Sequence, residues 1–359
     1  MEHITVYRDD TLYHIIPWLL QLKNGDLVLT VREAHARSKE QRGHVDPTVR
    51  GILLRSRDGG RTWGEKVVVD DETYRFSQTE DGPVAQLSDG SLFLNLYSWA
   101  ISAYQVGFQT DGGRPYAYTF DGEWTLRSLD LGRTWTPRQR LTVPGLPRLA
   151  ARTPVLELPD HTLLLAVYGN PSPGQDYRNA SPEQPYHSWV IRSTDMRKTW
   201  GSPAVLAADI EKKIAFAEPC LLRARTGELI AMMRTEGYLY QSNSSDSGHT
   251  WSQPIKTAMW GFPAHCWNYA TVASSARMAT GESLTECVHR SARMAARLGM
   301  SRTRSFSALM EELMTWDIPA LLSCLMDRFS PPTGSIGKGK VIQRPRPASS
   351  QARSIGPDS

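Results

Sequence analysis

The sequence predicts an all-β protein built from repeated four-stranded sheets, and three observations lead to this prediction. An eight-residue turn motif recurs along the chain, an apolar hairpin motif alternates with it, and helical periodicity is absent through residue 265. Repetition is informative about fold class because a repeated unit that cannot bury its own apolar face must stack on its neighbours.

The turn motif reads Ser-x-Asp-x-Gly-x-Thr-Trp and predicts a tight hairpin. Aspartate can accept hydrogen bonds from nearby backbone N–H groups, and glycine adopts a positive φ without strain. Threonine and tryptophan then begin the next strand, where the indole has a large apolar surface to bury. Copies occupy residues 56–63, 128–135, 193–200 and 244–251, and the third has Arg197 in place of the glycine. The residues expected to build these turns are Asp58, Trp63, Asp130, Trp135, Asp195, Trp200, Asp246 and Trp251.

The second motif is an apolar strand, a short turn and another apolar strand, and its period-2 alternation predicts a β-hairpin. Its four copies occupy residues 18–29, 84–94, 155–167 and 221–233. Each repeat of 45–70 residues therefore contains two hairpins. Two hairpins side by side make one four-stranded blade of a β-propeller.

The turn motif and its intervening hairpins resemble the sialidase superfamily, in which the motif is called the Asp box or BNR repeat. The resemblance covers residues 10–265 and implies a six-bladed β-propeller, of which about four blades are intact in this chain. It also implies that the Asp boxes lie on the outside of the blades, away from the catalytic site. The boxes therefore indicate a fold and not an activity.

The chain changes character after His265, so we predict propeller blades over residues 1–265 and a separate basic tail over residues 266–359. No Asp box follows His265, and the tail has a net charge of +5 against −1 for the rest. One interpretation is a genuine helical extension, with an amphipathic stretch at 306–329. The other is a frameshift.

The genetic code favours the frameshift. If each codon of the tail is read from its third base, the residues after His265 must give Leu-Leu-Glu-Leu and permit a following Asp-Gly. Further along, the pairs Met310-Glu311 and Met326-Asp327 are both forced to glycine, and the second permits Leu-Pro-Asp-Gly, the sixth hairpin motif. The hairpins of blades five and six are thereby recovered in register, which indicates an irregular or disordered tail in the translated chain.

The resemblance implies a site with three arginines that bind the sugar carboxylate, an aspartate acid/base and a tyrosine–glutamate nucleophile pair. Arginine suits this role because its planar fork binds a carboxylate through two hydrogen bonds. Asp46, ten residues ahead of the first Asp box, resembles the acid/base. It could equally be an ordinary loop aspartate before a proline.

Two further residues resemble parts of this site. Glu218 resembles the glutamate that activates the tyrosine, and Arg234 resembles the second arginine. Their sixteen-residue separation places them on opposite strands of one hairpin, although an acidic and a basic residue there could also form a structural ion pair. Arg152 precedes a strand that reaches the same rim and is a further candidate for substrate binding.

The chain departs from the family pattern at the first arginine, where Ile15 stands. His14 is adjacent, but alternation along a strand points it to the other face. Arg32, His35 and Arg37 follow shortly after, and we name Arg37 as a candidate substrate-binding residue. Each of these three could instead be a solvated loop residue. No tyrosine nucleophile is identifiable in the chain as written.

Composition narrows the possible functions. Hydrophobic residues make up 40% and charged residues 22%, a balance typical of soluble globular proteins. No stretch reaches the ~18 apolar residues of a membrane span, and no secretion signal is recognisable at Met1, so we expect a cytoplasmic protein. The four cysteines form no CxxC pair, and nothing indicates a metal, an organic cofactor or nucleic-acid binding.

The sequence therefore predicts a sialidase-like glycoside hydrolase, divergent and inactive in this form, with a glycan as its substrate or ligand. The alternative is a non-catalytic BNR-repeat propeller that binds carbohydrate or protein, because one fold serves many functions.

The frameshift can be checked by sequencing the DNA across codons 255–330. We expect the third-base frame to read through both forced glycines without a stop codon. A frame interrupted by stop codons would show that the tail is genuine.

Overall fold

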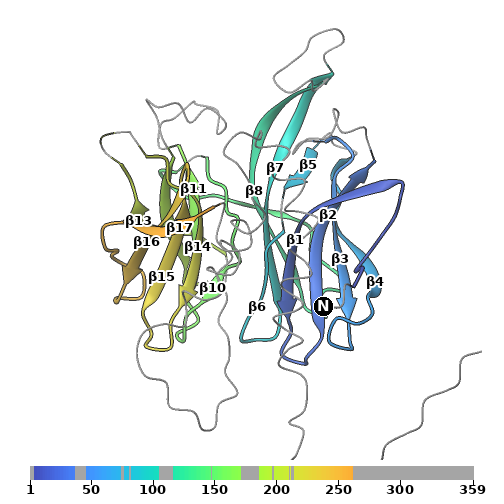
Figure 1. Ribbon diagram of the computed structural model, residues 1–359, viewed down its shortest axis with the longest axis horizontal. Coiled ribbons are helices and arrows are strands. Elements are labelled where there is room, and N and C mark those ends of the chain that lie inside the picture. The colour runs from blue at the N-terminus through green and yellow to red at the C-terminus, as the bar shows by residue number, and fades with distance from the viewer. Residues whose placement is uncertain are drawn as a thin grey trace, which may run out of the picture.

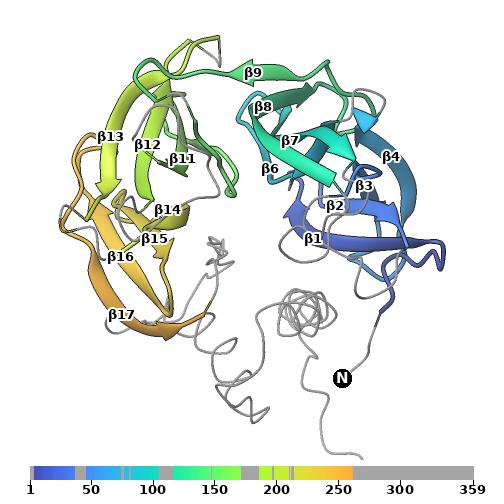
Figure 2. The same ribbon diagram turned by 90° about the horizontal axis from the view of Figure 1, so that it is seen from above.

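The computed structural model describes residues 4–36, 46–73, 77–80, 82–104, 116–146, 148–170, 186–195, 198–209, 211 and 214–261. These residues form strands β1 to β17 and no α-helix, which confirms the all-β prediction. The strands make four antiparallel sheets. Figure 2 shows the four sheets arranged in chain order around a common centre, as the blades of a propeller are. The predicted fifth and sixth blades fall outside the described residues.

The first two blades come from the first two hairpin and Asp-box repeats. Blade 1 has the strand order β1 (Leu12–Gln21), β2 (Leu27–His35), β3 (Arg50–Ser56) and β4 (Gly64–Asp70). In blade 2 the two short strands β5 and β6 pair with different parts of the same neighbour, β7. Its strands are β5 (Ser77–Glu80), β6 (Val84–Gln86), β7 (Leu92–Tyr104), β8 (Tyr116–Ser128) and β9 (Gln139–Leu141).

The other two blades repeat this order. Blade 3 consists of β10 (Leu156–Glu157), β11 (Leu163–Gly169), β12 (His187–Ser193) and β13 (Gly201–Ala207). Blade 4 consists of β14 (Ala217–Arg223), β15 (Leu229–Arg234), β16 (Tyr238–Ser244) and β17 (Ile255–Trp260). The last strands β4, β9, β13 and β17 lie on the outside of the arc in Figure 2.

The Asp boxes form the turns that the sequence predicts. In the first copy Asp58 accepts hydrogen bonds from the Thr62 hydroxyl at 2.6 Å and the Thr62 N–H at 2.9 Å. The hydroxyl of Ser56 accepts a bond from Gly60 N at 2.8 Å. The same 2.6 Å threonine–aspartate bond recurs in all four copies. The third copy keeps it although Arg197, outside the described residues, replaces the glycine.

The Asp boxes also hold neighbouring blades together. The guanidinium of Arg55, at the end of β3, donates to Leu131 O in the Asp box of blade 2. Arg192, at the same place in blade 3, donates to Gly248 O of blade 4 at 2.9 Å. Each contact joins a β-strand to the turn of the following blade, so the boxes act between blades as well as within them.

The hydrophobic core lies in layers between successive blades. One cluster between blades 1 and 2 includes Val28, Leu53 and Leu92, and a second between blades 3 and 4 includes Leu164 and Leu229. A third joins blades 2 and 3. Successive sheets therefore bury the faces that they turn towards each other, as strands with alternating apolar side chains require.

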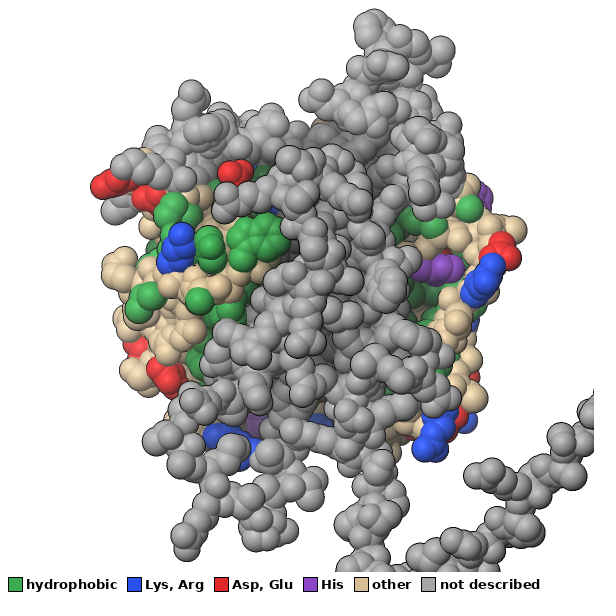
Figure 3. All heavy atoms as spheres, viewed as in Figure 1, with side chains coloured by type: hydrophobic (Ala, Val, Ile, Leu, Met, Phe, Trp, Pro, Cys, Tyr) green, Lys and Arg blue, Asp and Glu red, His purple; other side chains and the backbone are tan. Residues whose placement is uncertain are grey.

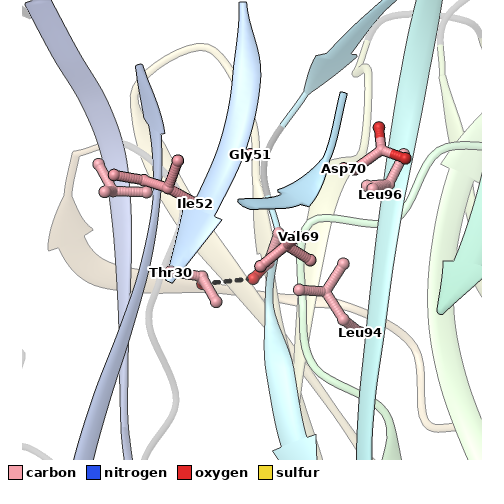
Figure 4. A pocket seen from close by; sticks show the side chains of 9 residues that line it. Thr30, Gly51, Ile52, Val69, Asp70, Leu94 and Leu96 are labelled. Carbon is pink, nitrogen blue, oxygen red and sulfur yellow. Dashed lines mark hydrogen bonds between the residues drawn. The ribbon is translucent and has the colours of Figure 1, made fainter. Parts of the chain in front are cut away.

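A small pocket lies in the layer between blades 1 and 2 (Figure 4). The hydroxyl of Thr30 donates to Gly82 O at 2.5 Å, and the remaining lining is largely apolar. The lining residues are Thr30, Val31, Gly51, Ile52, Val69, Asp70, Gly82, Leu94 and Leu96. We interpret it as imperfect packing between two sheets and not as a ligand site.

The two ends of each blade carry different features. Because the strands are antiparallel, the β1–β2 turn and the β3–β4 Asp box lie at one end of blade 1, and the β2–β3 connection lies at the opposite end. The same holds for blade 4. The start of β14 and the end of β15 therefore lie at the end away from the Asp boxes.

The first prediction from the fold concerns Gly248, which has a φ of +81° and whose added Cβ would lie 3.2 Å from Leu229 and 3.3 Å from Leu164. Gly248→Ala should lower the urea midpoint of unfolding, because it adds crowding between blades to the ~1 kcal/mol cost of a positive φ. Gly59→Ala is the control, since Gly59 has a φ of +73° with nothing within 4 Å. Equal effects in both variants would contradict the packing role.

The second prediction concerns acid stability. Hydrogen bonds from Thr134 and Thr199 lower the pKa of Asp130 and Asp195 to about 2. A carboxyl whose pKa is depressed in the folded state stabilises the protein above its unfolded pKa of about 4, and this contribution is lost as pH falls towards 2. We expect the melting temperature to fall over that window.

The comparison that checks this is a pH series of melting temperatures for Asp130→Asn, with the exposed Glu236→Gln as control. Asp130→Asn should lower the melting temperature at pH 7 and flatten its fall between pH 4 and 2. A slope unchanged from the wild type would contradict the assignment.

Candidate functional site

Glu218 lies between two arginines at the end of the blades opposite the Asp boxes. Arg152 Nη1 donates to its Oε1 at 2.6 Å, and Arg234 Nη1 donates to its Oε2 at 2.8 Å. The glutamate side chain is 7% exposed, against 16% for Arg152 and 28% for Arg234. The structure thus brings together three residues predicted from the sequence, one of them from a different blade.

A β-bulge aims Glu218 into this site. Ala217 pairs with Arg234, the register then shifts, and Cys220 pairs with Met232. Glu218 has a φ of +47° within the bulge, and Pro219 has no N–H to donate to the ladder. A bulge leaves one residue unpaired and redirects its side chain, which is why bulges recur beside functional sites.

The charges around Glu218 keep it ionised. Burial alone raises the pKa of Glu218, but the positive charges of Arg152 and Arg234, with their hydrogen bonds, outweigh burial and lower it. A carboxylate held in this way accepts hydrogen bonds and orients neighbouring groups, and it carries no proton to donate at neutral pH. The three side chains together leave one net positive charge.

An aromatic cluster adjoins the site, and sequence reasoning missed it. Tyr97 and Trp99 of β7 and Tyr168 of β11 are buried in one cluster with Ala217, the neighbour of Glu218. Trp99 meets Phe120 edge to face, with ring centroids 5.6 Å apart. In Figure 1 the β7–β8 hairpin that carries these rings rises beyond the other strands. The alternation of Tyr97 and Trp99 along one strand was the available signal.

Asp46, the predicted acid/base, lies in the β2–β3 connection of blade 1 and is 1% exposed. Its Oδ1 accepts hydrogen bonds from Thr48 N at 2.8 Å and from the Thr48 hydroxyl at 2.7 Å. The same hydroxyl accepts a bond from His35 N at 3.1 Å. These bonds hold Asp46 at the end of blade 1 that lies opposite its Asp box. Blade 1 and blade 4 lie on opposite sides of the centre (Figure 2).

The three candidate residues that follow Ile15 in the sequence differ in position and burial. Arg37 lies outside the described residues, and His35 is exposed at the end of β2. For Arg32 the solvated-loop interpretation is wrong. Arg32 lies within β2 and is only 1% exposed.

The strand alternation predicted around Ile15 is confirmed. His14 pairs with Glu33, and Ile15 pairs with Arg32, so the two pairs lie on opposite faces. His14 Nε2 lies 3.5 Å from Glu33 Oε2, in a charged group that also includes Arg50 and Lys66. Figure 3 shows charged side chains of both signs interspersed with hydrophobic ones on the described parts of the front face.

In the described ranges, no group of three or more histidine, cysteine, aspartate or glutamate side chains lies together as a metal site would. Within the same ranges, no helix has the length and hydrophobicity of a membrane span. Cys220 is buried and unoxidised, and the other three cysteines lie outside the described residues.

The fold and the contacts of Glu218 with Arg152 and Arg234 define a class of protein. It is an Asp-box β-propeller with an arginine-bound carboxylate where its third and fourth blades meet. A family model for the BNR repeat-like domain matches residues 34–308. The match spans more than half of the chain, and the chain belongs to the BNR repeat-like family. The membership predicted from the Asp boxes is thereby confirmed.

One solved structure supports this fold. A protein of unknown function from Dyadobacter fermentans DSM 18053 is 24% identical, with a TM-score of 0.59 over 73% of both chains. The leech intramolecular trans-sialidase is 13% identical, with a TM-score of 0.49 over 72% of this chain and 53% of its own. The intramolecular trans-sialidase of Ruminococcus gnavus is 14% identical, with a TM-score of 0.46 over 68% of this chain and 71% of its own. A search of curated proteins found no match.

The contacts among Arg152, Glu218 and Arg234 allow a prediction about stability. Glu218→Gln should destabilise the protein by about 3 kcal/mol, because it removes the carboxylate that Arg152 and Arg234 both contact. Adding Arg234→Gln should recover part of that loss, since it removes one of the two positive charges that no longer face Glu218. Urea unfolding of both single variants and the double variant measures this coupling.

Arg225→Gln is the matched control, because Arg225 is exposed in the turn of the same hairpin. It should leave the urea midpoint unchanged. Strictly additive effects of the Arg234 and Glu218 substitutions would contradict the coupling.

Proposed function

We propose that this protein is a divergent sialidase-like propeller that binds a glycan at Arg152, Glu218 and Arg234 and does not hydrolyse it in this form. The observation that carries the proposal is the Glu218 carboxylate held between two arginines from adjacent blades. Such a group pre-orients two guanidinium forks, and pre-ordered donors bind polar ligands with little loss of entropy.

Carbohydrate as the ligand class is supported by the surroundings of this group. The two guanidinium groups and the carboxylate supply hydrogen-bond donors and acceptors that suit the hydroxyl groups of a sugar. Tyr97, Trp99 and Tyr168 are buried in a cluster with Ala217, where they support the strand that carries Glu218. Several proteins of similar fold are named for action on glycans, including two intramolecular trans-sialidases and an α-L-arabinanase.

The absence of hydrolysis is proposed on chemical grounds. Glu218 is held as an anion by its two partners and is unsuited to protonate a leaving group. The family's first arginine is replaced by Ile15, and the tyrosine that the resemblance implies belongs to blade six, beyond His265. The domain boundary at His265 and the cytoplasmic location remain predictions.

The competing proposal is an active glycosidase. Asp46 favours it, because a buried carboxyl at the site end of blade 1 is placed as a general acid would be. Under this proposal Asp46 is the acid/base and Glu218 positions the nucleophile. A non-catalytic module that binds protein instead of sugar is the third possibility, and the same experiment separates the three.

The test combines turnover and binding. We expect the full chain to release no nitrophenol from aryl sialosides or other aryl glycosides, and to bind a subset of a glycan array. Glu218→Gln should weaken this binding at least tenfold, because it releases both arginines. Arg225→Gln should bind as the wild type does.

Two results would contradict the proposal. Turnover by the wild type that Glu218→Gln abolishes would establish a glycosidase. A folded wild-type protein that binds no glycan on the array would remove carbohydrate recognition altogether and leave the protein-binding module.

A further inference from the structure

Two exposed aromatic side chains lie opposite each other on the outer strands of blade 4. Tyr238, the first residue of β16, pairs with Trp260, the last residue of β17. Tyr238 is 40% exposed and Trp260 is 52% exposed. Directly opposite residues of antiparallel strands have Cβ atoms about 5 Å apart and share a face of the sheet, so the two rings adjoin. In Figure 2 these two strands lie farther from the centre than β14 and β15.

A lysine is held against one of the two rings. The ammonium nitrogen of Lys256 lies 4.3 Å from the centroid of the Tyr238 ring, which is a cation–π contact. Lys256 pairs with Tyr240, which lies two residues after Tyr238 and on the same face. The contact restricts a side chain that is otherwise flexible, so its three N–H donors stay beside the aromatic pair.

The turn between β15 and β16 positions the Trp260 indole. A Cβ added to Gly237, which has a φ of +125°, would lie 3.6 Å from Trp260 Nε1 and 3.7 Å from Trp260 Cδ1. The five-membered ring of the indole therefore lies against this glycine. Gly261 N donates to Gly237 O at 2.9 Å, and the Thr235 hydroxyl donates to Tyr238 O at 2.7 Å. These bonds tie the end of β17 and the start of β16 to one turn.

The aromatic pair is separate from the ion-paired group around Glu218. Met233 packs in the cluster shared with blade 3 and pairs with Tyr240, so Tyr240 and Tyr238 lie on this face of the blade. Arg234 is the next residue after Met233 and lies on the opposite face. Its partner Glu218 belongs to β14, at the other edge of the sheet from β17.

The size of the exposed surface decides between a protein and a sugar as its ligand. A whole aromatic side chain presents about 150–250 Å², so two half-exposed rings offer roughly 200 Å². A stable protein interface needs about 800 Å² from each partner. Among the described residues of this blade, Ile255 is also exposed, but it pairs with Gln241, the residue after Tyr240, and lies on the other face. The surface is thus too small for protein docking and has the size of one or two sugar rings.

The chemistry of the surface also suits a sugar. A pyranose ring presents apolar C–H groups on its faces and hydroxyl groups around its edge. Trp260 and Tyr238 offer flat apolar surfaces with few rotatable bonds, so they lose little conformational entropy when a ligand binds. Lys256 supplies N–H donors for the hydroxyl oxygens at the edge of the ring. Stacking and hydrogen bonds of this kind require no charge on the ligand.

We propose that Tyr238, Lys256 and Trp260 form a second carbohydrate-binding site, on the outer edge of blade 4. A neutral sugar ring stacks on Trp260 and accepts hydrogen bonds from Lys256, which Tyr238 holds in place. This site goes beyond the proposed glycan binding at Glu218, and neither site requires the other. Two sites on one protein raise the avidity for a polysaccharide that is long enough to span both.

The experiment titrates the full chain calorimetrically with three neutral probes: cellohexaose, maltohexaose and xylohexaose. We expect the wild type to bind at least one of them. Trp260→Ala should weaken that binding roughly tenfold or more, as truncation of a tryptophan at the centre of a binding surface does. Trp260→Phe should fall between, because it keeps a flat ring. Lys256→Gln should also weaken binding, and it leaves both rings in place.

Two controls separate this site from general surface effects and from the group around Glu218. Leu129→Ala removes another exposed apolar side chain, which is 75% exposed in the Asp box of blade 2, and should bind the probe as the wild type does. Glu218→Gln identifies probes that bind at the centre instead. A probe whose binding is lost in Trp260→Ala and kept in Glu218→Gln is bound at the edge of blade 4, whether or not any glycan binds at Glu218.

Three results would overturn the inference. The first is equal affinity of the wild type and Trp260→Ala for a bound probe, and the second is folded wild-type protein that binds none of the three probes. Both leave the proposed function at Glu218 standing, because the glycan array tests it separately. The third is a wild type that sediments as a dimer and becomes a monomer in Trp260→Ala, which would assign the two rings to a contact with a second copy.

Discussion

The packing of one sheet on the next is the constraint on which the rest of this structure depends. A four-stranded sheet with apolar residues on both faces cannot be stable alone in water, because each exposed apolar face costs free energy in proportion to its area. Val28, Leu53 and Leu92 bury the facing surfaces of blades 1 and 2, and Leu164 and Leu229 do so for blades 3 and 4. Every other feature follows from sheets stacked around a centre.

The Asp boxes make this stacking specific. Their aspartates close a hairpin within each blade, and the same turns receive an arginine from the blade before, as Arg55 and Arg192 show. Apolar packing alone is not directional, whereas a guanidinium directed at one carbonyl oxygen fixes the position of one sheet relative to another. The boxes therefore serve the architecture at one end of the blades, and the Arg152–Glu218–Arg234 group lies at the other end.

At that other end, the inner strands bring charged groups from different blades towards the centre. The bulge at Glu218 is central to this arrangement. In a regular strand this residue would pair with a residue of β15, whereas in the bulge it is unpaired and its carboxylate is directed to the two arginines. Arg152 comes from the segment before blade 3 and Arg234 from the second strand of blade 4. A buried ion pair of this kind adds little stability relative to apolar packing, which agrees with the binding role that we propose for it.

The sequence by itself determined the features that depend on neighbouring residues. The four Asp boxes, the hairpins and the family follow from local turn chemistry and from period-2 alternation, and the pairing of Glu218 with Arg234 follows from one hairpin. Only the tertiary structure decided which distant residues meet. Arg152 reaches Glu218 across 66 residues of chain, and Trp99 comes to lie near Ala217 through the curvature of the blades. The burial of Arg32 is a tertiary feature for the same reason, because its exposure depends on the folded surroundings of β2 and no local pattern in the sequence records them.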